Sequence, residues 1–199
     1  MNFLYMNNTN YEPADIIIYI FGKGMVLSEK SLVALDTSGT KILAYGAEAQ
    51  QMAMEKPENV HLISPLRQGM IADYLVSVNM FTHFLRKAIG KRPLRKPPIA
   101  VCVPKGMTEV EKKALEDAII QSGARELFIA DVPAKDLINA FPEKFPKLYK
   151  RFKIIIGITK EQPEHYVTER LQEALNYAGQ EGISPNQVWE LFQNLLQDS

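Results

Sequence analysis

The order of apolar and polar residues predicts short strands in the first part of the chain and alternating strands and helices in the second. In the first part, β-branched and aromatic runs bounded by turn residues predict strands at 15–21, 25–27, 31–36, 41–45 and 60–63. The runs at 25–27 and 31–36 are expected to pair with each other, and 65–72, which contains Gly69, is expected to be a loop. In the second part, strands are predicted at 99–103, 127–130 and 154–158.

Apolar residues at helical spacing predict helices at 47–54, 77–89, 109–122, 133–140, 166–178 and 185–196. Ser77 is the expected N-cap of the second helix, and Thr108 with Glu111 forms a capping box for the third. Pro142 and Pro146 are expected to prevent a long helix between residues 141 and 153. Strands that alternate with helices in the second part of the chain predict an α/β fold, a sheet with helical cover.

Composition indicates one soluble globular domain. The 199 residues are 46% hydrophobic and 23% charged, and 23 Lys and Arg balance 23 Asp and Glu. This balance gives no overall field for nucleic acid or membrane, and the single cysteine, Cys102, excludes an internal disulfide. The apolar run 16–21 is too short to cross a bilayer, and the apolar start 1–6 is too short for a signal sequence. A cytoplasmic protein that does not bind nucleic acid is therefore expected.

Residue types that often carry chemistry are scattered along the chain. His61, His83 and His165 have no Cys or carboxylate at metal-ligand spacing, so no metal site is predicted. Cys102 lies between two valines of a predicted strand and is expected to be a buried apolar residue rather than a nucleophile. The glycines of 22–24 are expected to form a turn.

A basic stretch lies between the helix predicted to end at 89 and the strand predicted to begin at 99. Its residues Lys91, Arg92, Leu94, Arg95 and Lys96 place four cations around one leucine. Such a stretch can touch anionic lipid or a protein partner, but a single leucine is far less apolar than an amphipathic membrane anchor. A solvated connector is the favoured interpretation, with peripheral membrane or partner contact as the alternative.

Several segments resemble the bacterial actin homologue MreB family in sequence, order and spacing. They lie at 22–36, 33–49, 65–73, 101–112 and 123–126. The resemblance spans residues 15–140 and implies domain I of the actin fold. The implied fold is a ribonuclease H-like core, a mixed sheet flanked by helices, with a small insertion, in a single actin-like domain over 1–199. The implied parts are a core (IA) at 10–27 and 76–158, an IB-like insertion at 28–75 and a divergent helical segment at 159–199.

Proteins of this family grip the phosphates of ATP in a loop that reads Asp-Leu-Gly-Thr-Ala-Asn-Thr, just before the strand that residues 17–20 continue here. In this chain Asn10 replaces the metal-linked Asp, Glu12 the Gly, Pro13 the Thr and Asp15 the Asn. Glycine lets backbone N–H groups approach phosphate closely, whereas proline has no N–H and carboxylates repel the nucleotide. The resemblance therefore implies a degenerate loop and no bound nucleotide cofactor.

Two further nucleotide-binding sequences of the family are altered. Its Glu-Glu-Pro sequence, in which a Glu positions the attacking water, corresponds to Asp131-Val132-Pro133, where Asp131 can imitate one Glu and Val132 cannot. Its second phosphate loop would follow the strand at 154–158, but 157–163 has no Asp and no Gly cluster, and the remaining residues leave no room for domain II. Because phosphoryl transfer depends on these contacts, no catalytic residue and no ATPase activity are predicted.

Altered nucleotide-binding sequences in a chain that otherwise resembles actin-fold domain I predict a non-catalytic pseudo-actin. The resemblance implies a protein partner, full-length MreB filaments of the same cell, and a link to cell shape in the cytoplasm, including the inner face of the membrane. One alternative is an actin-like ATPase whose residual site binds nucleotide weakly or is completed by dimerisation. A second alternative is an adaptor for an unrelated partner that binds at residues 141–199. The sequence leaves the oligomeric state open.

Overall fold

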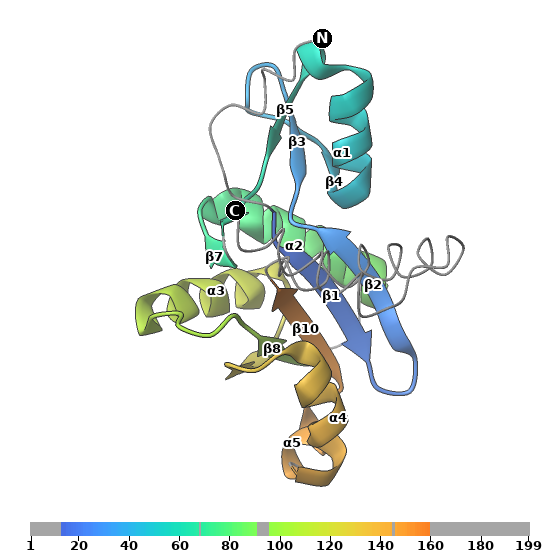
Figure 1. Ribbon diagram of the computed structural model, residues 1–199, viewed down its shortest axis with the longest axis vertical. Coiled ribbons are helices and arrows are strands. Elements are labelled where there is room, and N and C mark those ends of the chain that lie inside the picture. The colour runs from blue at the N-terminus through green and yellow to red at the C-terminus, as the bar shows by residue number, and fades with distance from the viewer. Residues whose placement is uncertain (1–12, 68, 91–95, 145, 160–199) are drawn as a thin grey trace, which may run out of the picture. The chain divides into compact units, whose positions relative to one another are not determined.

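A computed structural model of the chain describes residues 13–67, 69–90, 96–144 and 146–159. Its largest element is a five-stranded sheet of order β2-β1-β10-β8-β9 (Figure 1). The strands are Asp15–Ile20 (β1), Gly24–Lys30 (β2), Pro98–Cys102 (β8), Glu126–Ala130 (β9) and Ile154–Thr159 (β10). β10 pairs antiparallel with β1 and parallel with β8, and β8 pairs parallel with β9. The last described strand of the chain therefore lies at the centre of the sheet.

The sequences of the strands explain their places in the sheet. In β10, residues 154–158 are all buried, as expected of a continuous apolar strand that is covered on both faces. β1 and β2 form a hairpin, because Gly22 and Gly24 adopt φ values of 90° and 84° that other residues rarely reach. Residues 154–159 thus complete the core of the main sheet.

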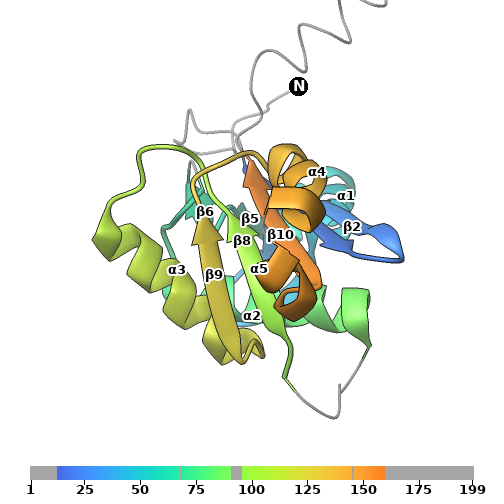
Figure 2. The ribbon, with the colours of Figure 1, turned by 90° about the horizontal axis from the view of Figure 1, so that it is seen from below.

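Among the described residues, two helices pack on each face of the main sheet. Helices α2 (Tyr74–Ile89) and α3 (Glu109–Ser122) pack on one face and enclose the larger core, which includes Ile16, Ile18, Ile99, Val101 and Ile156. Helices α4 (Ala134–Lys144) and α5 (Pro146–Arg151) pack on the other face, against Ala100 and Ile155. Figure 2 shows α4 and α5 in front of β10. A mixed sheet flanked by helices is the architecture that the sequence predicts.

A smaller unit is inserted between β2 and α2. Strands β3 (Val33–Asp36), β4 (Ile42–Tyr45) and β5 (Val60–Ile63) form an antiparallel sheet of order β4-β3-β5. Helix α1 (Gly46–Glu55) and the 3-10 helix η1 (Pro57–Asn59) complete this unit, whose own core includes Ala34, Ala44 and Ala49. The short strands β6 (Leu66–Arg67) and β7 (Met70–Ile71) lead back to α2. The unit occupies part of the stretch predicted as the IB-like insertion.

Two expectations for this part of the chain are wrong. β2 pairs with β1 and not with β3, because the tight turn at 22–24 folds β2 back on β1, while Leu32 enters the core of the smaller unit. Residues 65–72 contain the β6-β7 pair rather than only a loop. Gly69 has a φ of 84°, and a Cβ there would lie 2.7 Å from Pro104 Cγ, so glycine is required at this position.

The start of α2 also differs from the prediction. The N-cap is Asp73, whose carboxylate accepts a hydrogen bond from the Val76 N–H at 3.0 Å. Ser77 is fully buried within the helix, and its hydroxyl donates to the Pro65 carbonyl at 3.2 Å. Both residue types cap helices well, so only the tertiary contact of Ser77 separates the two choices.

The proline-containing stretch is more helical than predicted. α4 continues through Pro142 to Lys144, and α5 begins at Pro146. Phe141 is fully buried and stacks against Phe21 and Phe128, with ring centroids 6.1 and 6.2 Å apart. This packing stabilises the last turn of α4 despite the helical hydrogen bond that proline cannot donate.

The helices predicted at 166–178 and 185–196 lie outside the described residues. Within the described ranges, no helix combines the length and the apolar character needed to cross a bilayer.

Candidate functional site at the carboxyl end of the main sheet

The described positions of the degenerate nucleotide loops gather at one end of the main sheet. β8, β9 and β10 are parallel, so their carboxyl ends meet there, and β1 begins there because it runs antiparallel to β10. Asp15, the first residue of β1, lies opposite Thr159, the last residue of β10. Asp131 follows β9 directly. Open α/β sheets bind ligands at the carboxyl ends of their strands, which makes this end the candidate site.

Asp15 is held by a lysine of the neighbouring strand. Lys30 lies opposite it in register and places Nζ 3.0 Å from Oδ1 and 3.2 Å from Oδ2. The two side chains are 28% and 29% exposed, so the pair is partly shielded from water. The carboxylate of Asp15 is therefore paired with a lysine charge of the same sheet.

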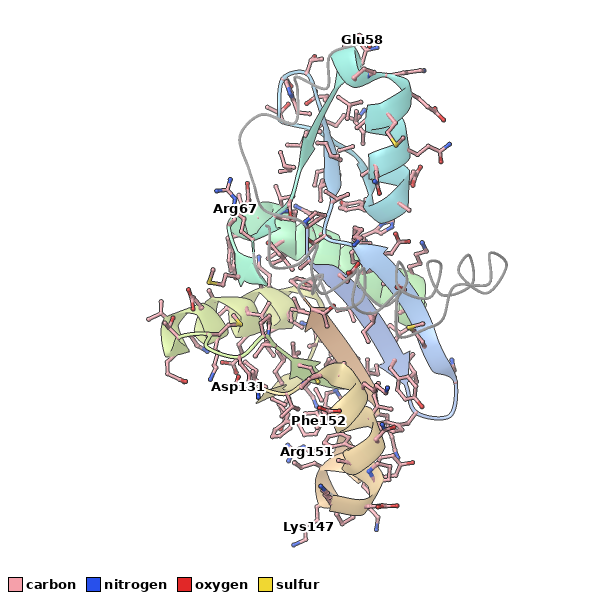
Figure 3. All side chains as sticks on the ribbon, viewed as in Figure 1. Glu58, Arg67, Asp131, Lys147, Arg151 and Phe152 are labelled. Atoms are coloured by element: carbon pink, nitrogen blue, oxygen red, sulfur yellow. The ribbon has the colours of Figure 1, made fainter. Side chains whose placement is uncertain are left out.

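The backbone just before β1 is occupied by contacts within the protein. Pro13 forms a β-bridge with Arg67 of β6, which is labelled in Figure 3. Ala14 is 1% exposed, and its carbonyl accepts a hydrogen bond from the Ser31 N–H at 2.7 Å. A phosphate-binding loop needs free N–H groups directed at the ligand. Proline has none and Ala14 is buried, so these two residues form no phosphate cradle.

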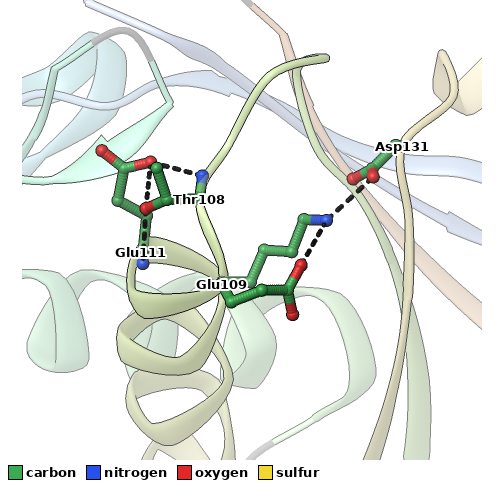
Figure 4. Close-up of polar contacts among 5 residues, drawn as sticks. Thr108, Glu109, Glu111 and Asp131 are labelled. Carbon is green, nitrogen blue, oxygen red and sulfur yellow. Dashed lines mark hydrogen bonds and ion pairs between the residues drawn. The ribbon is translucent and has the colours of Figure 1, made fainter.

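Asp131 is also bound to a lysine. Lys112 of α3 places Nζ 2.9 Å from Asp131 Oδ2 and 3.2 Å from Glu109 Oε1, as Figure 4 shows. Hydrogen bonds to Asp131 and then to Glu109 raise the pKa of Lys112, so the ammonium stays charged between the two acids. Val132, beside Asp131, is 37% exposed and carries no polar atom in its side chain. The second Glu of the family sequence therefore has no polar counterpart at this position.

The two carboxylates do not form one site. β10 and β8 lie between β1 and β9, so Asp15 and Asp131 are three strand spacings apart, about 14 Å. This separation is too large for both to ligate one ion. In the part of the chain that the structure describes, no group of three or more His, Cys, Asp or Glu side chains is placed to hold a metal ion.

Gly157, which corresponds to the start of the second phosphate loop, is a buried residue of β10. A Cβ at this position would lie 2.6 Å from Ala134 Cβ and 2.7 Å from Ile17 Cγ1. The missing side chain thus brings the start of α4 close to the sheet. Residues 160–163 of that loop lie outside the described residues.

Several sequence-predicted residues cannot be placed in this site. Asn10 and Glu12 lie outside the described residues, as do the members of the basic stretch other than Lys96, which is exposed at the opposite end of the main sheet, just before β8. The residues that sequence reasoning missed are the two lysines. Lys30 lies 15 positions from Asp15 and Lys112 lies 19 from Asp131, so no local pattern links either pair.

Comparison with known proteins decides the family. The family model described as MreB/Mbl protein matches residues 12–140, which is more than half of the chain. The chain belongs to the MreB/Mbl family. The match begins in the degenerate loop and ends within α4, so it contains the smaller unit and four of the main-sheet strands but not β10.

Curated relatives agree with the family match. The cell shape-determining protein Mbl of Bacillus subtilis is 39% identical over 132 residues, which cover 66% of this chain and 40% of Mbl. The cell shape-determining protein MreB of Escherichia coli is 37% identical over 132 residues, covering 64% of this chain and 38% of MreB. The chain thus spans about two fifths of the length of these relatives.

Solved structures confirm the actin-like fold. MreB5 of Spiroplasma citri bound to ADP superposes with a TM-score of 0.53 at 25% identity, covering 60% of this chain and 36% of that protein. The AMPPNP-bound structure of the same protein gives 0.56 at 24% identity, covering 65% and 39%. Such partial coverage fits domain I of an actin-like protein, the ribonuclease H-like part that the sequence resemblance implies.

Proposed function

We propose that this chain is a non-catalytic binding protein of the MreB/Mbl family, which contacts filaments of a full-length relative in the same cell. The proposal rests on the lysine partners and the separation of the two aspartates at the candidate site. Asp15 and Asp131 are each bound to a lysine, and β1, which carries Asp15, is not a neighbour of β9, which Asp131 follows. This arrangement supports a site that has lost phosphoryl transfer, since that reaction needs metal, water and phosphate contacts at one point.

The retained scaffold supports a binding role. Filaments of head-to-tail subunits grow because each subunit carries both complementary surfaces. A family member that offers only part of these surfaces binds a filament end or side without propagating it. The proposed consequence is a change in filament length, and thereby in cell shape, in the cytoplasm and at the inner face of the membrane.

Sedimentation with the full-length MreB or Mbl of the same cell, in the presence of ATP, tests this function. We expect the protein to pellet with the filaments and to shorten them at substoichiometric concentration. A clean supernatant together with unaltered filaments would overturn the proposal.

Residual nucleotide binding, in one chain or in a site completed by dimerisation, is the second candidate. Asp131 favours it, because this residue lies where the family has a Glu. A nucleotide that binds the native state must raise the melting temperature, by an amount set by its concentration relative to Kd. We expect no shift with Mg-ATP. A shift that Asp131→Asn removes, together with phosphate release, would replace our proposal with an ATPase.

An adaptor for an unrelated partner is the third candidate. It is favoured by α5 and β10, which lie beyond the family match at 12–140 and yet pack within the fold. Unaltered filaments in the sedimentation experiment, with no Mg-ATP stabilisation, would turn the search to partners of this region.

A further inference from the structure

Basic side chains gather at the amino end of the main sheet, where β8, β9 and β10 begin. The fold brings together six exposed cations, here called the basic end: Lys23, Arg125, Lys147, Lys150, Arg151 and Lys153. The segments that carry them, 21–24, 125–126 and 146–153, contain a single carboxylate, Glu126. The whole chain has no net charge, so the fold creates a local excess of positive charge that composition does not reveal.

Specific contacts hold these segments side by side. The Phe21 N–H donates to the Lys153 carbonyl at 3.0 Å, which joins the β1-β2 turn to the start of β10. Arg151 Nη2 lies 2.6 Å from Glu126 Oε2, which joins the end of α5 to the start of β9. These contacts bring Lys23 and Arg125 to the cations of 147–153, which are neighbours in the sequence. Lys147 and Lys150 lie on the same short helix, α5, as Arg151.

Lys96, the described member of the basic stretch identified in the sequence, lies next to this surface. The Arg125 N–H donates to the Pro97 carbonyl at 2.9 Å, and Lys96, just before it, is exposed. Lys96 therefore extends the positive charge of the basic end toward β8.

Within the described ranges, most of these cations have no acidic partner. Arg151 is paired with Glu126, and Lys153 places Nζ 3.4 Å from the centre of the Tyr149 ring. Among the described residues, Lys147 and Lys150 have no acidic partner within ion-pair distance. Figure 3 shows Lys147 and Arg151 on α5. Like charges held close together repel each other, and an anionic partner would remove this repulsion.

The neighbouring side chains favour a protein as that partner. Met25, next to the turn, is 63% exposed, and Met and Arg are enriched in protein interfaces. The Arg151–Glu126 pair shows that a carboxylate fits against this surface. The rings of Phe21 and Tyr149 contact each other edge to face, with centroids 4.8 Å apart, and are half-buried, so they offer no free platform for stacking nucleic-acid bases.

We propose that the basic end binds an acidic segment of a protein partner, with an apolar residue of that segment packed against Met25. The inference deepens the proposed function and rests on it, because it names the surface and the partner chemistry through which a filament would be bound.

A double variant that reverses two charges of the basic end, compared with a matched control variant, tests the proposal. The test variant is Lys147→Glu/Lys150→Glu, and the control is Lys56→Glu/Lys105→Glu, two exposed lysines outside the basic end. The probe is a fluorescein-labelled peptide of alternating Glu and Leu, compared with the same peptide carrying Gln for Glu. We expect the native protein and the control to bind the acidic peptide, and the test variant to bind about tenfold more weakly. Equal affinities of the two variants would overturn the proposal.

Two further measurements, vesicle binding and sedimentation with filaments, distinguish failure of the basic-end proposal from failure of the proposed function. Binding to phosphatidylglycerol vesicles without binding to the acidic peptide would overturn the protein assignment and identify lipid as the partner. In sedimentation, equal pelleting of test variant and control with filaments would overturn the inference and leave the proposed function standing. Loss of peptide binding in the test variant, with no pelleting of the native protein, would support the basic end and overturn the filament proposal.

Discussion

At Gly157 the central strand β10 has no side chain, and helix α4 uses that space. Ala134 Cβ and Ile17 Cγ1 lie within 2.7 Å of the point where a Cβ would stand. Real carbon atoms do not approach so closely, so any side chain here must displace α4 or β1. A position that aligns with the start of a phosphate loop thus serves core packing.

We expect Gly157→Ala to lower the free energy of unfolding by about 1–3 kcal/mol, the usual cost of overpacking a core. Urea denaturation measures this change. The second substitution Ala134→Gly removes one of the two close contacts, so the double variant should lose less stability than the sum of the single variants. Strictly additive effects would show that Ala134 and residue 157 do not press on each other.

At the scale of elements, a charged contact joins the smaller unit to the main sheet. Tyr45, at the N-cap of α1, makes no capping hydrogen bond with its side chain. Glu29 of β2 supplies the cap instead: its Oε2 accepts from the Ala47 N–H at 2.8 Å, and its Oε1 lies 2.7 Å from Lys87 Nζ of α2. Tyr45 also stacks on His83 of α2, with ring centroids 4.3 Å apart. The start of α1 thus contacts both β2 of the main sheet and α2, which covers that sheet.

Glu29→Gln should lower the free energy of unfolding by about 1 kcal/mol at pH 7, because the ion pair with Lys87 and the negative charge at the N-terminus of α1 are lost. Burial raises the pKa of Glu29, but hydrogen bonds from Lys87 and Ala47 outweigh it and hold the pKa below its usual 4.5. The folded state therefore binds this proton less readily than the unfolded state. The stabilisation is present above pH 4.5 and is lost as the pH falls through the lower folded pKa.

Urea denaturation of the native protein and of Glu29→Gln, at pH 7 and at about pH 3, measures the effect. The difference between the two proteins should shrink at the lower pH. Glu58→Gln, an exposed residue of η1, is the control and should change little at either pH. A difference that is independent of pH would contradict the assigned role of the Glu29 carboxylate.

The start of α3 carries a capping box that is readable in the sequence. The Thr108 hydroxyl accepts from the Glu111 N–H at 3.3 Å, and Glu111 Oε2 accepts from the Thr108 N–H at 2.7 Å (Figure 4). We expect Thr108→Ala to lower the free energy of unfolding by about 1 kcal/mol. Thr82→Ala is the control, because that hydroxyl only bonds back to the Val78 carbonyl within α2. Thermal denaturation should separate the two, and equal losses would contradict the capping role.

At the scale of the whole molecule, we expect chemical labelling of the Cys102 thiol to measure global unfolding. It lies in β8, is 2% exposed, and packs in the core between α4 and the sheet. Burial raises the pKa of its thiol to about 12, so the reactive thiolate is scarce in the folded protein. We expect Ellman's reagent to label Cys102 at the rate of unfolding, with acceleration as urea is raised. Rapid labelling without denaturant would show that the sheet opens locally at β8.

Much of the fold could be predicted from local sequence. Apart from the short strands β6 and β7, the strands were predicted close to their observed places, as were the four predicted helices that fall within the described residues. Apolar periodicity reflects which face of each element is buried. The N-cap of α2 was predicted wrongly, because Asp73 and Ser77 both suit that position and sequence alone does not choose between them. The helix predicted at 133–140 extends to Lys144, because the packing of Phe141 outweighs the effect of Pro142. Each was decided by a contact with another element.

The sequence by itself determined the family resemblance, and with it the prediction that the nucleotide loops are altered, because both depend only on which residues follow one another. Only the tertiary structure decided that β10 lies between β1 and β8, that Asp15 and Asp131 are bound to lysines, and that Lys23 and Arg125 join the cations of 147–153 in the basic end. These features join residues that are distant in the chain. They follow from strand pairing and burial across the whole sheet, where the contact of one residue depends on the placement of all the others.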